Sequence, residues 1–141
     1  MPTDEHPVSD DERLDAAYRA ADYVCAGHTL RTGTPQPAFD AWLRERGYAA
    51  YSFVTPHNPM SEPLPPAKNA GRYAEFLRLI EARGYEHAPA AAHDPAGAWP
   101  TEHGVLLFDV PQVKVRELAR DWQQNAVVEG RVGEAPRVVW V

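Results

Sequence analysis

The chain contains a single cysteine, Cys25, among its 141 residues. One cysteine cannot close a disulfide within the chain or supply a cysteine-rich zinc site, so the composition fits a reducing compartment. Six histidines are present, and the candidate metal ligands are His57, His93, His103 and Glu102. Their spacing matches no helical two-histidine pattern, so we expect no metal and no other cofactor. We interpret Cys25 as a small core residue, because no basic neighbour in sequence would lower its pKa.

Positive charge and long apolar runs are also scarce. The 14 Lys and Arg residues stand against 20 Asp and Glu, which argues against general binding to nucleic acid or to an acidic membrane surface. No apolar run approaches the roughly 20 residues of a membrane span. Residues 1–8 are interpreted as a disordered acidic tail. They lack an apolar core, so we do not expect a signal peptide. We expect a soluble cytoplasmic protein with a single domain at 9–141.

Two further absences concern catalysis. No serine stands in a Gly-x-Ser-x-Gly turn, and no glycine-rich phosphate loop follows a predicted strand. The residues therefore name no reaction, and both an enzyme and a binding protein are consistent with them.

What the sequence does contain is a series of segments with helix or strand periodicity. The predicted helices are 9–25, 35–46, 67–83 and 111–122, and the predicted strands are 48–55, 85–90, 105–110, 126–129 and 137–141. Ser9 would cap the first helix, and Cys25 would continue it toward its end. Gly47 and Gly84 are expected to close the second and third helices as left-handed caps.

From 48–55 onward the order is strand, helix, strand, strand, helix, strand, which predicts an α+β fold with a ferredoxin-like, split βαβ sheet. We expect helices on one face of this antiparallel sheet, two extra N-terminal helices and one extra C-terminal strand. Pro89 would interrupt a central ladder, so the strand at 85–90 is expected at a sheet edge.

This topology predicts that three polar stretches, 55–61, 99–103 and 123–125, converge at one rim of the sheet. The helix start with Lys68, Asn69 and Arg72 joins them there. Its exposed N–H groups and two cations would suit a carboxylate or a phosphate.

Eight residues from these stretches are candidates for a functional site. Glu102 is the candidate general acid or base, because partial burial between Trp99 and an apolar strand would raise its pKa. The candidate ligand-binding residues are Asn58, Ser61, Asn69, Arg72, Trp99, His103 and Gln124. Structural roles are the alternatives, such as an Asx-turn for Asn58 and backbone or ion-pair bonds for Glu102.

Several of these residues stand in motifs that occur in order along the chain. The motifs are Thr55-Pro56-His57-Asn58-Pro59-Met60-Ser61, Asn69, Trp99-Pro100-Thr101-Glu102-His103-Gly104 and Gln124-Asn125-Ala126. With them, residues 14–130 resemble a bacterial family known as domain of unknown function 3293. His57 stands where the family usually has Trp, and Gly104 where it often has Ser. The family has no established activity, so the resemblance implies a pocket without naming what fills it.

We therefore expect a protein that binds a small polar or anionic molecule such as a nucleotide fragment. If it is an enzyme, it would also act on this molecule. The alternative is a non-catalytic interaction module. Its basis is the C-terminal strand at 137–141, an edge strand through which two copies could pair as a homodimer.

Overall fold

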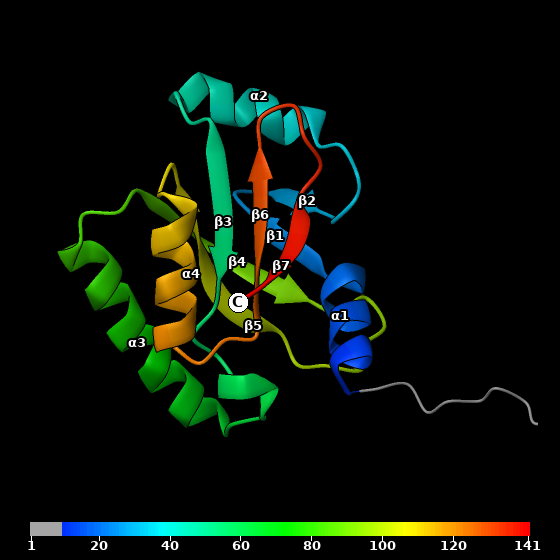
Figure 1. Ribbon diagram of the computed structural model, residues 1–141, viewed down its shortest axis with the longest axis vertical. Helices are drawn as coiled ribbons and strands as arrows, with labels where there is room; N and C mark the ends of the chain where they lie inside the picture. The colour runs from blue at the N-terminus through cyan, green and yellow to red at the C-terminus, as the bar shows by residue number, and fades with distance from the viewer. Residues whose placement is uncertain (1–9) are drawn as a thin grey trace, which may run out of the picture.

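The computed structural model describes residues 10–141, which form a mixed α+β protein (Figure 1). The helices are α1 (Asp10–Ala20), α2 (Pro37–Arg46), α3 (Pro66–Ala82) and α4 (Gln112–Asp121), with a short 3₁₀ turn at Pro59–Ser61. The strands are β1 (Asp22–Cys25), β2 (His28–Leu30), β3 (Ala50–Val54), β4 (His87–His93), β5 (Glu102–Phe108), β6 (Ala126–Arg131) and β7 (Arg137–Trp140). The tail predicted at 1–8 and the capping residue Ser9 lie outside the described residues. Within 10–141, no helix combines the length and apolarity that crossing a membrane requires.

All seven strands belong to one antiparallel sheet in the order β2-β1-β4-β5-β3-β6-β7. The sheet is larger than predicted because residues 22–30 form a hairpin, whereas a helix was expected to continue to Cys25. The hairpin turn consists of Ala26 (φ 50°) and Gly27 (φ 80°), and two positive φ values are typical of a type I′ turn. Cys25 is thus a strand residue. It is buried in the core as expected, and burial raises the pKa of its thiol to about 11.

Pro89 lies on an internal strand, which corrects the expected edge position of this segment. The ladder between β1 and β4 ends at Ala90, and Pro89 is the next residue along β4, paired with Val105 of β5. Because Pro89 stands just beyond the β1 ladder, its missing N–H removes no bond between β1 and β4. The β1–β2 hairpin therefore pairs with the edge of β4 that was expected to be unpaired. Pro89 is tolerated because it lies where this pairing ends.

The sheet separates two apolar cores. Side chains alternate along β3, so Tyr51 and Phe53 point into one core and Val54 into the other. Helices α3 and α4 pack on the Val54 face, and α2 packs on the Tyr51 face with Phe39 and Leu43 (Figure 1). Gly47 ends α2 in the left-handed conformation, with φ 76°, as predicted.

The sheet is curled around the core that contains Tyr51. Near α2, the loop after β2 meets the loop before β7, where the N–H of Gly33 donates to the carbonyl of Pro136 at 2.8 Å. At the other end α1 packs against β7, and the indole N–H of Trp140 donates to Asp15 at 3.0 Å. The predicted ferredoxin-like arrangement is not confirmed, because the sheet has seven strands and helices cover both of its faces.

Candidate functional site

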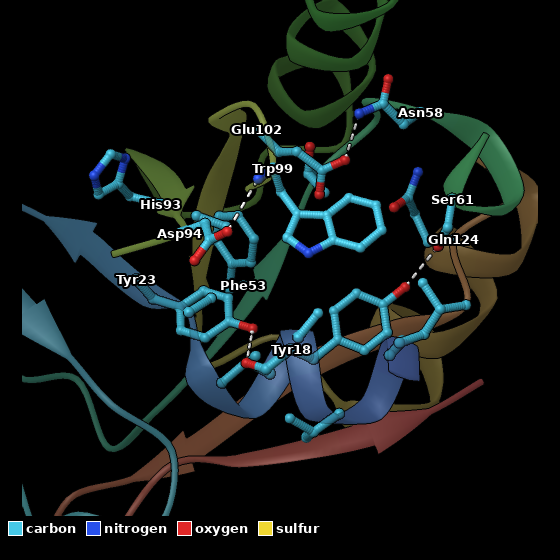
Figure 2. Close-up of a pocket in the computed structure, with 18 of the residues that line it drawn as sticks. Tyr18, Tyr23, Phe53, Asn58, Ser61, His93, Asp94, Trp99, Glu102 and Gln124 are labelled. Carbon is cyan, nitrogen blue, oxygen red and sulfur yellow. Dashed lines mark hydrogen bonds between the residues drawn. The ribbon is translucent and has the colours of Figure 1, made fainter. Parts of the chain in front are cut away.

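A pocket of about 90 Å³ opens at the end of the curled sheet that α1 covers (Figure 2). Its apolar floor consists of Leu14 and Ala17 of α1, Phe53 of β3, Val128 of β6 and Val138 of β7. Its polar side is built by the loop after β3, the beginning of β5 and the loop after α4. The pocket thus joins an apolar interior to the rim at which the sequence predicted polar residues to meet.

Asn58 holds the polar side together. Its backbone N–H donates to Oδ1 of Asn69 at 3.0 Å, and its own Oδ1 accepts from Nδ2 of Asn69 at 2.8 Å and from the N–H of Leu64 at 3.0 Å. Its Nδ2 donates to Oε2 of Glu102 at 2.7 Å. The amide that folds the loop therefore also orients the carboxylate of Glu102.

The three stretches predicted to converge do lie together. The Asn58 to Glu102 hydrogen bond joins the first stretch to the second. Nε2 of Gln124 donates to the carbonyl of His57 at 3.0 Å, and this bond joins the third stretch to the first. In the described chain, Oε1 of Gln124 has no hydrogen-bond partner, and Figure 2 shows the side chain at the pocket wall. It is a free acceptor at the wall of the pocket.

A pair of hydroxyl groups forms a second polar feature of the pocket wall. Oγ of Ser61 accepts from Nδ2 of Asn125 at 2.7 Å and lies 2.8 Å from the hydroxyl oxygen of Tyr18. The two hydroxyls carry two hydrogens, but the bond between them uses only one. One O–H donor is therefore left for a ligand or a water. Burial raises the pKa of Tyr18, so this hydroxyl stays protonated at neutral pH.

Glu102 is the only glutamate that lines the pocket within residues 10–141. It begins β5, one residue from His103, and alternation along the strand turns the two side chains to opposite faces of the sheet. Burial raises the pKa of Glu102, and the hydrogen bond from Asn58 opposes this shift. Oε1 accepts no hydrogen bond from the described residues, so one oxygen of a partly desolvated carboxylate faces the pocket.

Trp99 stands at the mouth of the pocket, with 49% of its surface exposed. Its N–H donates to Oδ2 of Asp94 at 3.0 Å, and Asp94 also accepts from the N–H groups of Ala96 and Ala98. These backbone donors, Ala96 foremost, lower the pKa of Asp94. The turn fixes Trp99 so that its indole points into the pocket, with Glu102 on one side and Tyr18 on the other (Figure 2).

The predicted site residues fall into two groups. Those that line the pocket are Asn58, Ser61, Trp99, Glu102 and Gln124. Asn69, Arg72 and His103 do not line it. Asn69 supports Asn58, and the guanidinium of Arg72 donates to the carbonyls of Pro56 at 2.7 Å and Trp122 at 2.8 Å. The cations expected at the start of α3 are therefore not part of the pocket wall.

His57 is buried beneath the rim, and its ring lies against Tyr73 and His103. Burial lowers its pKa to about 4, and the nearby charges of His103 and Arg72 act in the same direction. His57 is thus neutral at physiological pH. Within 10–141 no group of three or more His, Cys, Asp or Glu side chains could hold a metal ion.

Sequence reasoning missed several residues that line the pocket, among them Tyr18, Tyr23 and Asp94. The sequence periodicity places Tyr18 on the apolar face of the first helix. Its hydroxyl was the one feature that could have indicated a polar role as well. Tyr23 was placed in that same helix, although it belongs to β1 and donates its hydroxyl to the carbonyl of Tyr18 at 2.6 Å. Asp94 precedes a Pro/Gly loop, which is the typical place for a capping carboxylate.

Backbone strain is concentrated at the same rim. Six residues other than glycine have positive φ within 10–141, and four of them lie here: Asn58, Met60, Ser61 and Gln123. The N–H of Met60 donates to the carbonyl of Gln123 at 2.6 Å, so two strained loops hold each other. Strain of this kind costs stability and is typical of ligand-binding sites.

The comparisons with known proteins give a family and no function. The family model described as "Protein of unknown function (DUF3293)" matches residues 54–127, more than half of the chain. This segment contains the loop after β3, the beginning of β5 and the loop after α4. No curated protein and no solved structure matches the chain.

Proposed function

We propose that the chain, which belongs to the DUF3293 family of proteins of unknown function, binds a small polar organic molecule in this pocket. The proposal rests on the geometry of the pocket alone. The observation that carries the proposal is the combination of unused polar groups and an apolar floor in one cavity. The carboxylate of Glu102 and the amide of Gln124 each present a free acceptor, and the Tyr18–Ser61 pair presents a donor. Orienting polar groups on an apolar wall are typical of small-molecule sites.

The size of the pocket limits the ligand. An engineered cavity of about 150 Å³ holds benzene. At about 90 Å³ this pocket therefore takes a group of a few non-hydrogen atoms, and a larger ligand must leave its remainder outside the mouth beside Trp99. A nucleotide fragment could place only part of itself inside. If the protein is an enzyme, Glu102 is our candidate acid or base, since burial raises its pKa and so makes its protonated form more accessible than that of an ordinary glutamate.

A substitution that fills the pocket tests this proposal. Ala17→Leu adds apolar volume from α1, whereas Ala16→Leu makes the same change at an exposed position of that helix. We expect polar fragments to shift the NMR resonances of the Trp99 indole and the Gln124 amide in the wild type and in Ala16→Leu, but not in Ala17→Leu. Equal shifts in both variants would place the binding elsewhere and contradict the proposal.

The inner strands support a related structural proposal. The order β4-β5-β3-β6, with α3 between β3 and β4 and α4 between β5 and β6, has the connections of a split βαβ unit. We propose that this unit is a ferredoxin-like core extended by the β1–β2 hairpin and by β7. An experimental structure superposed on known split βαβ proteins would test the relationship, and failure of the inner strands to superpose would contradict it.

The second candidate function is pairing of two copies through β7. It is favoured by the position of β7 at the edge of the sheet. However, α1 packs against this strand, which limits the room for a partner. We expect a dimer mass in solution if β7 pairs. A proline at Val138 would then abolish it, because the N–H of Val141 bonds inward to Asn125 and alternation turns the N–H of Val138 to the free edge. A monomer mass at high concentration would exclude this function.

A further inference from the structure

The pocket has aromatic walls and an acidic rim. Four aromatic residues line it, namely Tyr18, Tyr23, Phe53 and Trp99. The acidic residues that line it are Glu102 and Asp94, and no Lys or Arg within 10–141 does so. His93 also reaches the lining, where its Nδ1 lies 3.0 Å from the Thr101 hydroxyl. The local charge therefore disfavours an anion.

The two acidic residues are not equivalent. Both oxygens of Asp94 accept hydrogen bonds from backbone N–H groups of the turn, so its acceptor capacity is largely used. Glu102 uses only Oε2, for Asn58, and leaves Oε1 free. Oε1 of Gln124 is the second free acceptor among the described residues of the wall. A ligand that satisfies both oxygens must carry hydrogen-bond donors.

We propose that the ligand is an organic cation with N–H groups, a primary ammonium or a guanidinium on a short aliphatic chain. Glu102 and Gln124 would accept its hydrogens, and the faces of the aromatic side chains would attract its charge. This inference rests on the proposed function and names the ligand class of the same pocket. In this proposal the charged end of the ligand lies inside the pocket.

The dimensions of the pocket agree with this assignment. A head group of a few non-hydrogen atoms fits in about 90 Å³, and the aliphatic chain would leave past the half-exposed ring of Trp99. A cation in an apolar pocket is unfavourable unless a counter-charge and hydrogen bonds accompany it. Glu102 supplies the counter-charge, and the Tyr18–Ser61 pair can solvate a remaining hydrogen through an oxygen lone pair.

Probes that differ mainly in charge test the inference. We would add butylammonium, 1-pentanol and valerate separately at millimolar concentration and follow the Trp99 indole and the Gln124 amide by NMR, with Trp42 of α2 as a reference. We expect butylammonium to bind at least about tenfold more tightly than the other two, because a hydrogen bond to a charged group contributes at least that factor. Tighter binding of pentanol or valerate would overturn the cation assignment but leave the proposed function. Silence of all three probes would contradict both.

A charge-removing pair of variants assigns the effect to one residue. Glu102→Gln keeps an oxygen that can accept from Asn58 and removes the negative charge. Glu62→Gln makes the same change on the loop beside the pocket but outside its lining. We expect Glu102→Gln to weaken butylammonium binding about tenfold and to leave pentanol binding unchanged, while Glu62→Gln changes neither. Equal effects of both substitutions would show a diffuse charge effect and overturn the direct contact.

Discussion

Nδ2 of Asn58 lies 2.7 Å from Oε2 of Glu102, and this hydrogen bond connects the strained loop after β3 to the first residue of β5. One amide thus completes the fold of the loop and fixes the carboxylate of the pocket. Asn58 binds one oxygen of Glu102 and thereby orients the side chain, while the other oxygen can still accept hydrogen bonds. This arrangement allows the contributions of the two residues to stability and to the proposed binding to be separated by mutation.

Glu102→Gln is expected to stabilise the protein at neutral pH. Burial raises the pKa of Glu102 above its ordinary value of 4.5. The folded protein then holds the proton at pH values where the unfolded chain has lost it, so stability falls as the pH rises from about 4.5 through the raised pKa. A glutamine has no charge to desolvate and avoids this loss. Melting temperatures of both proteins across the pH range should differ at pH 7 and converge below 4.5. A variant that is less stable than wild type at pH 7 would contradict the prediction.

Asn58→Ala is expected to destabilise the protein strongly. The substitution removes three side-chain hydrogen bonds, those to Nδ2 of Asn69, to the N–H of Leu64 and to Oε2 of Glu102. Unsatisfied buried groups cost about 1–3 kcal/mol each, and relaxation of the loop should limit the total to about 2–4 kcal/mol. Urea unfolding measures this difference.

The matched control for Asn58→Ala is Asn125→Ala, which removes the side-chain hydrogen bond to Ser61 at the same rim. This change should cost about 1 kcal/mol. Equal losses in the two variants would indicate that Asn58 does not organise the loop.

The sequence predicts the inner part of the fold well, because its signals are long and periodic. The helix with Phe76 and Ile80 and the apolar strand with Val105 and Leu107 lie where expected, and all four side chains are buried. The β1–β2 hairpin was missed for a local reason. Its strands have only four and three residues, and alanine stands in the turn where asparagine would have indicated type I′ geometry.

The sequence could predict which segments converge at the candidate site, because topology decides this. It could not predict which side chains enter the pocket, because that depends on side-chain direction. Convergence of the stretches with Asn58, Glu102 and Gln124 follows from the order of elements alone. The position of His103 does not, because the strand begins three residues earlier than expected, at Glu102, and alternation along it turns the His103 side chain away from that of Glu102. The wall from α1 was also beyond prediction, since no local signal places Tyr18 against the far end of the chain.

His57 is expected to make the protein sensitive to acid. Its pKa is lowered from 6.5 to about 4, mainly by burial. Between these values the unfolded chain binds a proton that the folded protein excludes, so stability decreases as the pH falls from 6.5 to about 4. With allowance for solvent screening, the loss is on the order of 2 kcal/mol.

Two measurements check this expectation for His57. An NMR titration of its ring should show the neutral form down to about pH 4, and His57→Gln should flatten the pH dependence of unfolding in urea. Comparison with the same variant is needed because Glu102 changes stability in the opposite direction in the upper part of this window. A measured pKa near 6.5 would contradict the buried, neutral state.

Gly130→Ala is expected to destabilise the core through Tyr51. A Cβ on Gly130 would overlap the ring and hydroxyl of Tyr51, which is 2% exposed and packs against Phe39 with ring centroids 5.2 Å apart. The rigid ring cannot move without displacing the neighbouring aromatic side chain, so overpacking should cost about 1–3 kcal/mol.

Gly71→Ala is the control, because it lies inside α3, away from the residues at either end, and its Cβ would meet nothing within 4 Å. There alanine should stabilise the protein by about 0.5–1 kcal/mol, since it loses less backbone entropy than glycine in a helix. Unfolding in urea should therefore shift in opposite directions for the two variants, and a neutral Gly130→Ala would show that the Tyr51 ring has room that the geometry does not give it.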